Sequence, residues 1–273
     1  MSIPYDPSPP LVTPAQVLKE QCERQGVPAA SLRLPPVLVG TFQGASFSHL
    51  IARVGADQPS SRSDGTAIET GVTVGKTSGG DPIAVARLPA GAPAAVIALE
   101  EAIARGVRSI LVVGSAGSLQ PDLPVGSTVI VTDAVREEGT SYHYLPSGES
   151  VRADPEIVSL LTRCAGTVGA EPTKGPAWTT DAPYRETIGS VQRHRANGVK
   201  VVEMEASAIF ALSQVRRVRA GLLVAVSDEL FDSWRPGFHD PAYLESLTRC
   251  VDATIAAAEQ LTADERTHSA GPT

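Results

Sequence analysis

Short apolar runs rich in β-branched residues alternate with helical patterns along most of this 273-residue chain. The runs that predict strands lie at residues 36–40, 82–88, 109–113, 127–132, 199–203 and 221–227. The clearest helices are predicted at about 92–105, 154–165, 204–217 and 241–261. Because strands that alternate with helices form parallel sheets with helices on their faces, we expect an α/β fold. The prediction is a single domain with a central, mixed, mostly parallel sheet flanked by helices.

The boundaries of this domain follow from its two ends. Thr13 followed by Pro14 is typical of an N-cap and the first position of a helix, which we expect to stop near Gly26. Residues 1–12 are rich in proline, so an extended N-terminal segment is expected there. Residues 262–273 are polar and lack periodicity, and we expect them to form a flexible tail. The predicted domain is therefore residues 13–261.

Charge and cysteine content exclude several classes of protein. The net charge of −7 and the pI of about 5.3 argue against nucleic acid as a partner. Cys22, Cys164 and Cys250 lack the number and spacing of a disulfide framework or a zinc site, so we expect no metal. Neither a signal peptide nor a membrane span is evident in the sequence. We expect a cytoplasmic protein without membrane contact that acts on a small molecule.

Polar residues follow predicted strands at three points, where a parallel sheet places its ligand-binding groups. At the first point, the run 109–113 is followed by Gly114-Ser115-Ala116-Gly117-Ser118. These small residues let backbone N–H groups approach an anion or a sugar closely. The alternative interpretation is an ordinary tight turn at the end of a strand.

Carboxyl groups mark the other two points. Glu203 and Glu205 flank Met204 at the start of a predicted helix, where the helix dipole alone also favours acids. A carboxylate there can accept hydrogen bonds from the two vicinal hydroxyls of a furanose, and these bonds strengthen as positive charge develops on the ring. Asp228 ends the most apolar strand, where it either caps the next helix or donates a proton to a leaving group as a general acid.

Taken in order, the segments VVGSAGSL, VVEMEASAIFAL and LLVAVSDEL resemble the nucleoside phosphorylase superfamily, which includes purine nucleoside phosphorylases, uridine phosphorylases and methylthioadenosine nucleosidases. The resemblance extends over about residues 36–260 and implies the phosphorylase/hydrolase-like fold. It implies that Glu205 binds the ribose 2′- and 3′-hydroxyls, with Met204, Glu203 and Ser115 beside the sugar. It also implies that Asp228 faces N7 of a purine, so Glu205 and Asp228 are the predicted catalytic residues.

A further segment, TTDAPYRET at residues 179–187, occupies the place of the base pocket in that superfamily. The resemblance therefore implies base contacts from Thr179, Thr180, Tyr184 and Arg185, together with Asp228. An aromatic side chain commonly stacks on the base in this segment, but this chain has Pro183 at that position. Tyr184 and Arg185 can equally serve in loop packing or in a surface ion pair.

The residues expected to bind the acceptor of the sugar, which is phosphate or water, depart from the superfamily pattern. We call this part of the site the acceptor end. Its phosphorylases carry a Gly-Asp-Pro-x-Arg loop and an arginine just before the central glycine turn, and both arginines bind phosphate. In this chain Gly44 and Val112 stand at those two places. The predicted acceptor loop, for phosphate or for water, consists of Gly40, Thr41, Gly114 and Ser115. Candidates for a replacement cation are Arg53, Arg62, Arg136, His49 and His143.

These features predict an enzyme, a nucleoside phosphorylase-type pentosyltransferase that cleaves the N-glycosidic bond of a nucleoside, purine rather than pyrimidine. Phosphorolysis is preferred because residues 134–146, AVREEGTSYHYLP, resemble uridine phosphorylases. The alternatives are a nucleoside hydrolase (nucleosidase) and a non-catalytic nucleoside-binding protein. The nucleosidase branch activates its water with a glutamate near the first strand, and residues 40–49 contain no acid. No cofactor is expected beyond phosphate as co-substrate, and the resemblance implies a homo-oligomer, a dimer or a hexamer.

Overall fold

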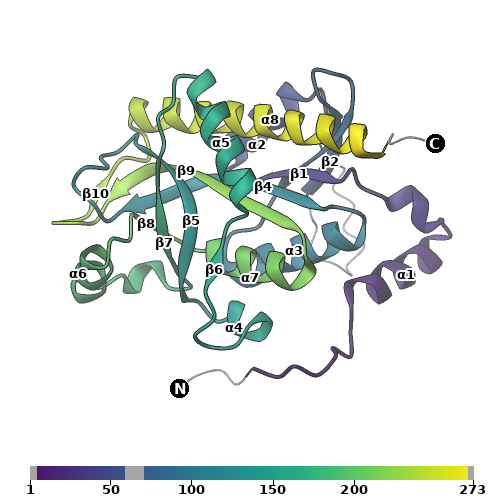
Figure 1. Cartoon of the computed structure of the whole chain (residues 1–273), viewed down its shortest axis with the longest axis horizontal. Coiled ribbons are helices and arrows are strands. Elements are labelled where there is room, and N and C mark those ends of the chain that lie inside the picture. The colour runs from purple at the N-terminus through teal and green to yellow at the C-terminus, as the bar shows by residue number, and fades with distance from the viewer. Residues whose placement is uncertain (1–4, 59–70, 270–273) are drawn as a thin grey trace.

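Strands and helices alternate through residues 5–58 and 71–269, the part of the chain that the computed structural model describes (Figure 1). The strands of this part join in one ten-stranded sheet: β1 (Val37–Thr41), β2 (Gly71–Lys76), β3 (Pro82–Arg87), β4 (Ser109–Ser118), β5 (Thr128–Glu137), β6 (Val151–Arg152), β7 (Thr173–Thr180), β8 (Val201–Glu203), β9 (Arg219–Glu229) and β10 (Arg235–Pro236). Its helices are α1 (Pro14–Gln25), α2 (Gly44–Arg53), α3 (Ala92–Ala104), α4 (Ser141–Tyr144), α5 (Pro155–Thr167), α6 (Ile188–Ala196), α7 (Ala206–Arg216) and α8 (Pro241–Ser269), with 3-10 turns η1 (Ala29–Leu32) and η2 (Pro183–Arg185). Each run predicted as a strand forms one.

Five strands of the sheet pair in a closed ring. β4 pairs in parallel with β9, β9 pairs antiparallel with β5, and β5 pairs in parallel with β7. β7 then pairs in parallel with β8, which returns to β4 in antiparallel pairing. From β4 the sheet continues through β1 and β3 to β2 as an open extension. The sheet is mixed and the α/β fold is confirmed.

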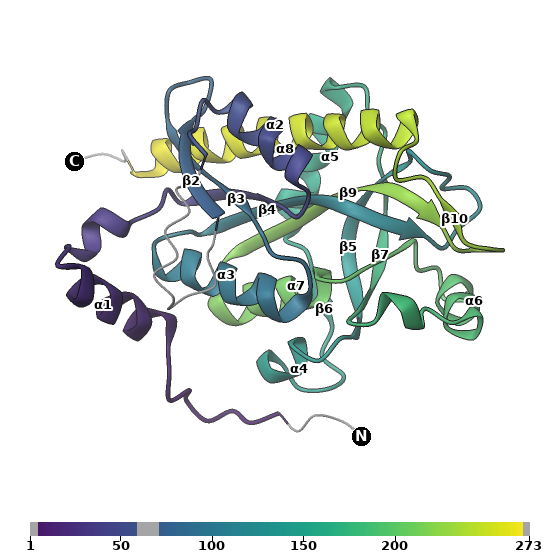
Figure 2. The same cartoon turned by 180° about the vertical axis from the view of Figure 1, so that it is seen from behind.

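Helices cover both faces of this sheet, as the two views show (Figures 1 and 2). α2, α5 and α8 lie together over one face, where Leu50, Ile157 and Val251 are buried among the side chains of the strands. α3 and α7 lie together over the other face, where Leu99 and Phe210 are buried. The apolar periodicity of these helices thus follows from burial against the sheet.

The predicted start of the first helix is confirmed in detail. The Thr13 hydroxyl accepts a hydrogen bond from the backbone N–H of Gln16 at 3.3 Å, and the Gln16 side chain bonds back to the backbone N–H of Thr13 at 2.8 Å. Pro14 occupies the first helical position, and Gly26 ends the helix with φ +65°. This capping box with a left-handed C-cap satisfies the backbone groups that a helix leaves unpaired at its ends.

Two elements near the functional end were not predicted from the sequence. β7 contains Gly175 and Pro176, residues that normally weaken a strand. Gly175 is required here because a Cβ at that position would lie 2.5 Å from Cγ of Lys200, and the Pro176 carbonyl accepts a hydrogen bond from the Lys200 N–H. α2 begins at Gly44, directly after the segment interpreted as a loop, and buries Phe47 and Leu50 on one side. Packing against other parts of the chain, and not local sequence preference, therefore explains why β7 is a strand and α2 a helix.

The C-terminal helix is longer than expected. Residues 262–269 were expected to belong to a flexible tail, but α8 continues to Ser269. Thr262 is buried, and Glu265 forms an ion pair with Arg219 of β9 at 3.0 Å. These contacts attach the last part of α8 to the sheet. At the other end, the described residues 5–12 contain neither helix nor strand, and the extended conformation expected for residues 1–12 stays a prediction.

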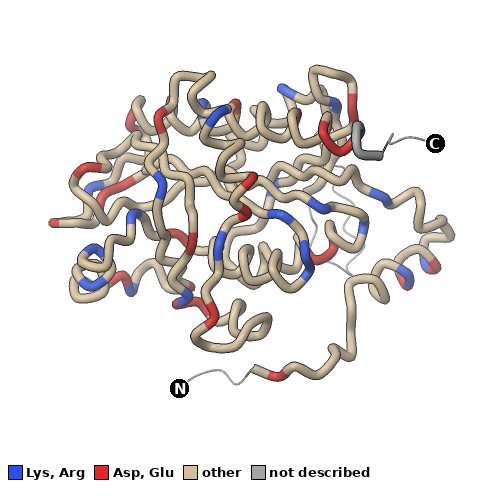
Figure 3. Tube along the Cα trace, viewed as in Figure 1, with Lys and Arg blue, Asp and Glu red and all other residues tan. Residues whose placement is uncertain are grey.

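Charged residues of both signs are interspersed along the described trace (Figure 3). No band of basic residues of the kind that binds nucleic acid is visible in that part of the chain. Among the described helices, none combines the length and apolar character that a membrane crossing requires.

Candidate active site

A cavity of about 670 Å³ opens where β4, β8 and β9 end. It is lined by six residues predicted for the site, namely Ser115, Glu203, Met204, Glu205, Asp228 and Tyr184. Register explains why these strand ends meet, because Gly117 of β4 pairs with Val202 of β8 on one side and with Asp228 of β9 on the other. The volume falls in the range of small-molecule sites.

Glu205 is the N-cap residue of α7 and its side chain is buried. The backbone N–H of Gly91, which precedes α3, donates to Oε1 of Glu205 at 2.6 Å. Burial raises the pKa of Glu205, and the neighbouring charge of Glu203 raises it further. The carboxyl group is therefore fixed in orientation and lies in a dry environment, where hydrogen-bond donors from a ligand bind it strongly.

Both carboxyl oxygens of Glu203 accept hydrogen bonds from other residues of the chain. Its Oε2 accepts the backbone N–H groups of Glu205 and Ala206 at 2.7 and 2.6 Å, and its Oε1 accepts the hydroxyl of Thr179. Burial raises the pKa of Glu203. The two backbone bonds fix the turn that presents Glu205, so the structure gives Glu203 a positioning role. Its predicted contact with the sugar stays a prediction.

Thr179 and Thr180 lie outside the cavity lining. The Thr179 hydroxyl lies behind Glu203 and also accepts the backbone N–H of Ser207 at 2.9 Å. Thr180 is buried, and its hydroxyl accepts the N–H of Ala182 at 3.3 Å. Both threonines, expected to contact the base, hold the strand end in place instead.

Asp228 has two side-chain partners at the end of β9. Ser227 Oγ donates to Oδ1 at 2.8 Å, and the indole Nε1 of Trp234 donates to Oδ2 at 3.0 Å. The residues that follow lead to β10 and not to a helix, so a helix cap is not the role of Asp228. Gly117 makes room beside it, because a Cβ there would lie 2.4 Å from Cδ1 of Leu230.

Aromatic residues that the sequence interpretation missed lie at the mouth of the cavity. Trp234 and Phe238 line it from the segment around β10, with ring centroids 6.4 Å apart, and they are 62% and 47% exposed. The sequence feature that could have indicated these two aromatic residues is that they follow Asp228 by only a few positions. Tyr184 also lines the cavity but is 99% exposed. Arg185 is exposed and outside the lining, which agrees with the alternative of a surface residue.

Glu186 is a further cavity residue that the sequence interpretation missed. It follows η2, is half-buried and lines the cavity together with Asp228. Burial, followed by the negative charge of Asp228, raises the pKa of Glu186 to about 7. A second carboxyl group thus faces the part of the cavity that contains Asp228.

The raised pKa of Glu186 makes stability depend on pH in a defined direction. Between its ordinary pKa of 4.5 and about 7, the folded protein holds this proton more tightly than the unfolded chain. Glu186 therefore contributes stability at low pH that is lost as the pH rises through about 7. We expect Glu186→Gln to make the fall in melting temperature between about pH 5 and pH 8 shallower than in the wild type, as measured by thermal unfolding. Identical slopes would show that Glu186 has an ordinary pKa.

The acceptor end of the cavity carries a chain of neutral hydrogen-bonding groups. Thr41 Oγ1 donates to Gln43 Oε1 at 3.1 Å, Gln43 Nε2 donates to Ser115 Oγ at 2.9 Å, and Ser115 Oγ is 2.5 Å from the Tyr243 hydroxyl. Burial raises the pKa of Tyr243. Gln43 and Ser115 line the cavity directly. Gln43 and Tyr243 were not predicted from the sequence.

The two predicted acceptor glycines have packing roles. Gly40 lies inside β1, and a Cβ there would be 2.7 Å from Cδ1 of Leu88. Gly114 lies inside β4, and a Cβ there would be 3.4 Å from the ring of Phe42. Neither lines the cavity. These glycines let side chains pack closely beside the site and do not themselves form its wall.

The described candidates for a replacement cation are engaged elsewhere. His49 and Arg53 both pair with Asp252 of α8 at 3.0 Å. Arg136 donates to the carbonyl oxygens of Leu145, Pro146 and Glu149. Arg62 lies outside the described residues. None of these described side chains lines the cavity.

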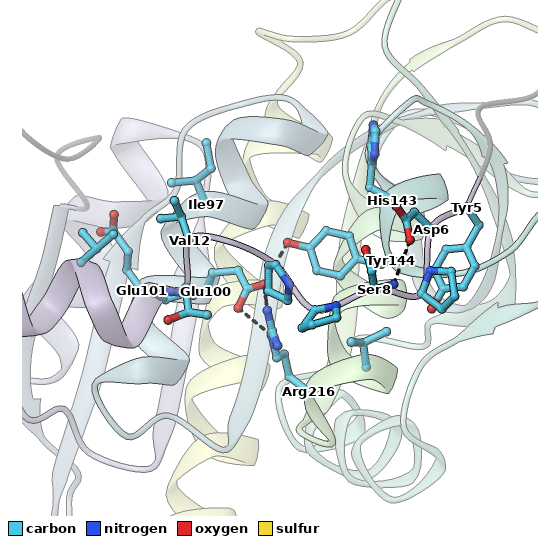
Figure 4. A pocket seen from close by; sticks show the side chains of 17 residues that line it. Tyr5, Asp6, Ser8, Val12, Ile97, Glu100, Glu101, His143, Tyr144 and Arg216 are labelled. Atoms are coloured by element: carbon cyan, nitrogen blue, oxygen red, sulfur yellow. Dashed lines mark hydrogen bonds and ion pairs between the residues drawn. The ribbon is translucent and has the colours of Figure 1, made fainter.

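His143 lines a second cavity, of similar volume, between the N-terminal segment and the body of the molecule (Figure 4). Two of the charged groups that line this cavity pair with each other, since Arg216 forms an ion pair with Glu100 at 2.7 Å, and the Tyr144 hydroxyl also donates to Glu100 at 2.9 Å. This cavity contains none of the predicted sugar or base residues. In the described part of the chain, no three His, Cys, Asp or Glu side chains gather as metal ligands would.

Comparison with known proteins identifies relatives of the chain. A sequence model described as the phosphorylase superfamily matches residues 37–261. The uridine phosphorylase of Escherichia coli (strain K12) is 30% identical over 161 residues, which cover 54% of this chain and 64% of that protein. The guanosine phosphorylase of Halorubrum lacusprofundi is 35% identical over 140 residues, which cover 51% and 58%. The chain thus matches less than two thirds of the length of either relative.

The fold has a counterpart among solved structures. The crystal structure of purine nucleoside phosphorylase from Toxoplasma gondii in complex with immucillin-H superposes with a TM-score of 0.76. The sequences are 22% identical, and the match covers 85% of this chain and 93% of that chain. At this level of identity the likeness shows the shared fold.

Proposed function

This chain belongs to the phosphorylase superfamily, and from that premise we propose that it is an enzyme that cleaves the N-glycosidic bond of a nucleoside by phosphorolysis. The products are a free base and a pentose-1-phosphate. The observation that carries the proposal is the arrangement of Glu205, Ser115 and Asp228 around one cavity of about 670 Å³. Each of these side chains has the chemistry that one part of the reaction requires.

The sugar is bound through Glu205 in this proposal. Its buried carboxylate, oriented by the Gly91 N–H, accepts hydrogen bonds from the 2′- and 3′-hydroxyls. As the bond between C1′ and the base nitrogen breaks, positive charge develops on the ring, and the negative carboxylate stabilises that charge. Met204 supplies the apolar surface beside the sugar.

The base leaves with the help of Asp228. An oxygen of phosphate attacks C1′, the C1′–N bond breaks, and its electron pair passes into the base. Asp228 in its protonated form then gives the proton to N7 of a purine, so the base departs as a neutral molecule and the carboxylate that remains accepts the hydrogen bonds of Ser227 and Trp234. Protonation at N7 is a direct route for a purine, which supports purine nucleosides over pyrimidine nucleosides as substrates. Trp234 and Phe238 offer aromatic surface to the base.

The phosphate requirement tests the proposal against hydrolysis. Hydrolysis is the second candidate because Gly44 and the buried Val112 supply no guanidinium at the two expected phosphate positions. We expect purified protein to release base from purine nucleosides only when inorganic phosphate is present, with pentose-1-phosphate as the second product. Base release and sugar products are measured by chromatography over a panel of purine and pyrimidine nucleosides.

The outcomes of this assay separate three functions. Equal base release without phosphate, with free pentose as the second product, would contradict phosphorolysis and establish the hydrolase. Binding of nucleosides by calorimetry without any base release would establish a non-catalytic binding protein. Faster turnover of uridine than of inosine or guanosine would contradict the purine preference while leaving phosphorolysis in place. Assembly as a homo-oligomer and location in the cytoplasm stay predictions.

A further inference from the structure

Gly44, the first residue of α2, stands where related phosphorylases carry an arginine, and a different arginine lies beside it. A Cβ placed on Gly44 would be 3.8 Å from Cζ and from Nη2 of Arg87. Arg87 is the last residue of β3, and in the parallel pairing of β1 with β3 it stands opposite Thr41. The guanidinium of Arg87 therefore lies close to the space that the start of a side chain at position 44 would occupy.

Arg87 does not itself line the cavity, but it stands opposite the start of a chain of hydrogen bonds that reaches the cavity wall. Thr41 begins the chain of hydrogen bonds that runs through Gln43 to Ser115, and both of the latter line the cavity. α2 also packs against β3, so the start of this helix and the end of the strand are neighbours (Figure 2). The guanidinium thus lies next to the residue that follows Gln43.

Arg87 has no partner among the described residues that would neutralise its charge. Within the described part of the chain it forms neither a hydrogen bond nor an ion pair, and it is exposed. The N-cap residue Gln43 does not cap α2 with its side chain, and the first turn contains no acid. Ser46, in the same turn, has a buried hydroxyl without a partner among the described residues. The positive charge of Arg87 therefore lies beside the uncapped start of α2, where an anion is stabilised, whereas the buried Ser46 hydroxyl does not reach the cavity.

We propose that Arg87 binds the phosphate co-substrate, supplying from β3 the guanidinium that related phosphorylases supply from the position of Gly44. This inference rests on the proposed phosphorolysis. Phosphate is bound at the acceptor end by Arg87 with Gln43 and Ser115, opposite the sugar held by Glu205. A guanidinium recognises a phosphate dianion through two parallel hydrogen bonds, so one arginine here restores much of the affinity that its absence at position 44 removes.

The first test is Arg87→Ala. We expect KM for phosphate to rise by about 10–100-fold, the effect of losing a charge-assisted pair, while calorimetry gives an unchanged Kd for nucleoside. The matched control is Arg33→Ala, since Arg33 is also exposed and lies outside the cavity lining. The control should keep wild-type KM values. An unchanged KM for phosphate in Arg87→Ala would overturn the inference.

The second test moves the arginine back to position 44. Apart from Gly44's chain neighbours and the helix's own backbone, no atom of the described residues lies nearer than 3.8 Å to a Cβ at Gly44, so the start of a side chain fits there. We expect Gly44→Arg in the Arg87→Ala background to lower KM for phosphate again, by about 10-fold, because a guanidinium returns to the same region. If Arg87→Ala is impaired only through its folding, this second substitution brings no recovery, and the inference is then wrong.

Direct binding of inorganic phosphate distinguishes failure of the inference from failure of the proposed function. Titration calorimetry of wild type and Arg87→Ala with inorganic phosphate needs no turnover. If base release proves independent of phosphate while phosphate binding is still weakened about 10–100-fold in Arg87→Ala, phosphorolysis is wrong and the role of Arg87 as an anion ligand stands. If the wild type binds no phosphate, or both proteins bind it equally, the role of Arg87 is refuted whatever the reaction.

Discussion

Asp228→Asn is expected to lower kcat for a purine nucleoside by about 10²–10⁴-fold, the usual contribution of a positioned general acid. The amide keeps the size of the carboxyl group; its oxygen can accept from Trp234 Nε1, and its nitrogen can donate to Ser227 Oγ in a hydrogen bond of reversed direction. What it loses is the proton that neutralises the departing base. Steady-state kinetics should therefore show the loss in kcat, while calorimetry shows a nucleoside Kd close to that of the wild type.

A neighbouring aspartate provides the control for this experiment. Asp232 is 80% exposed at its side chain and pairs with Arg195 at 3.7 Å. Asp232→Asn removes the same charge from the same segment and should retain kcat within about a factor of two, since exposed ion pairs contribute little. Wild-type turnover in Asp228→Asn would refute the general-acid role. A loss confined to KM would assign Asp228 to binding alone.

Glu205→Gln is expected to weaken both sugar binding and the chemical step, with kcat/KM lowered by about 10²–10³-fold. The amide can accept one hydrogen bond, but it carries no negative charge to stabilise the positive ring. Because that charge is largest in the transition state, kcat should fall in addition to the rise in the nucleoside Kd. Steady-state kinetics and calorimetry on the same preparation separate the two effects.

Glu101→Gln is the matched control for Glu205. Glu101 is a half-buried glutamate whose pKa, like that of the more deeply buried Glu205, is raised by burial, but it lies on α3 and lines the second cavity. Its substitution should leave kcat/KM near the wild-type value. If Glu205→Gln changes Kd and leaves kcat intact, the carboxylate binds the sugar equally in the ground state and the transition state, and its catalytic role is refuted.

The sequence was sufficient to predict the α/β fold and the cavity residues that stand at the ends of predicted strands. Apolar runs and helical periodicity predicted the central strands, because burial between two helical layers imposes that pattern on each strand. Ser115, Glu205 and Asp228 were found because each stands at or near the end of a predicted strand, where a sheet exposes its functional groups. Local pattern and function coincide at these positions.

The rest of the site depends on contacts between segments that are distant in sequence. Glu186, Trp234 and Phe238 reach the cavity only through η2 and the segment around β10, and these have no periodicity to read. Thr179 was predicted to contact the base from its place in the chain, yet it lies behind Glu203. Gly40 and Gly114 were predicted to belong to a loop, but β1 and β4 extend through them.

At the acceptor end, too, contacts between distant segments could not be predicted from the sequence. An arginine is missing at position 44 in the linear pattern, and the sequence alone offered Arg53, Arg62, Arg136 and the histidines as replacements. Nothing in the sequence indicates that Arg87, at the end of the predicted strand 82–88, is a neighbour of Gly44, from which 43 residues separate it along the chain. The pairing of β1 with β3 removes that separation. Strand order, which no local pattern reveals, decides which side chains become neighbours.

The closed ring of strands divides the site into a constrained part and an adaptable part. Ser115, Glu203 and Asp228 belong to β4, β8 and β9, which are members of the ring and have partners on both sides. A displacement of one of them would disturb the pairing of its neighbours around the ring, so under the proposed function the sugar and the base meet a preformed surface. Arg87 belongs to the open extension, where β3 pairs with β1 and β2, two strands outside the ring. Under the same proposal, a related protein can change how it binds its second substrate through substitutions in β3, while the strands of the ring keep the nucleoside site.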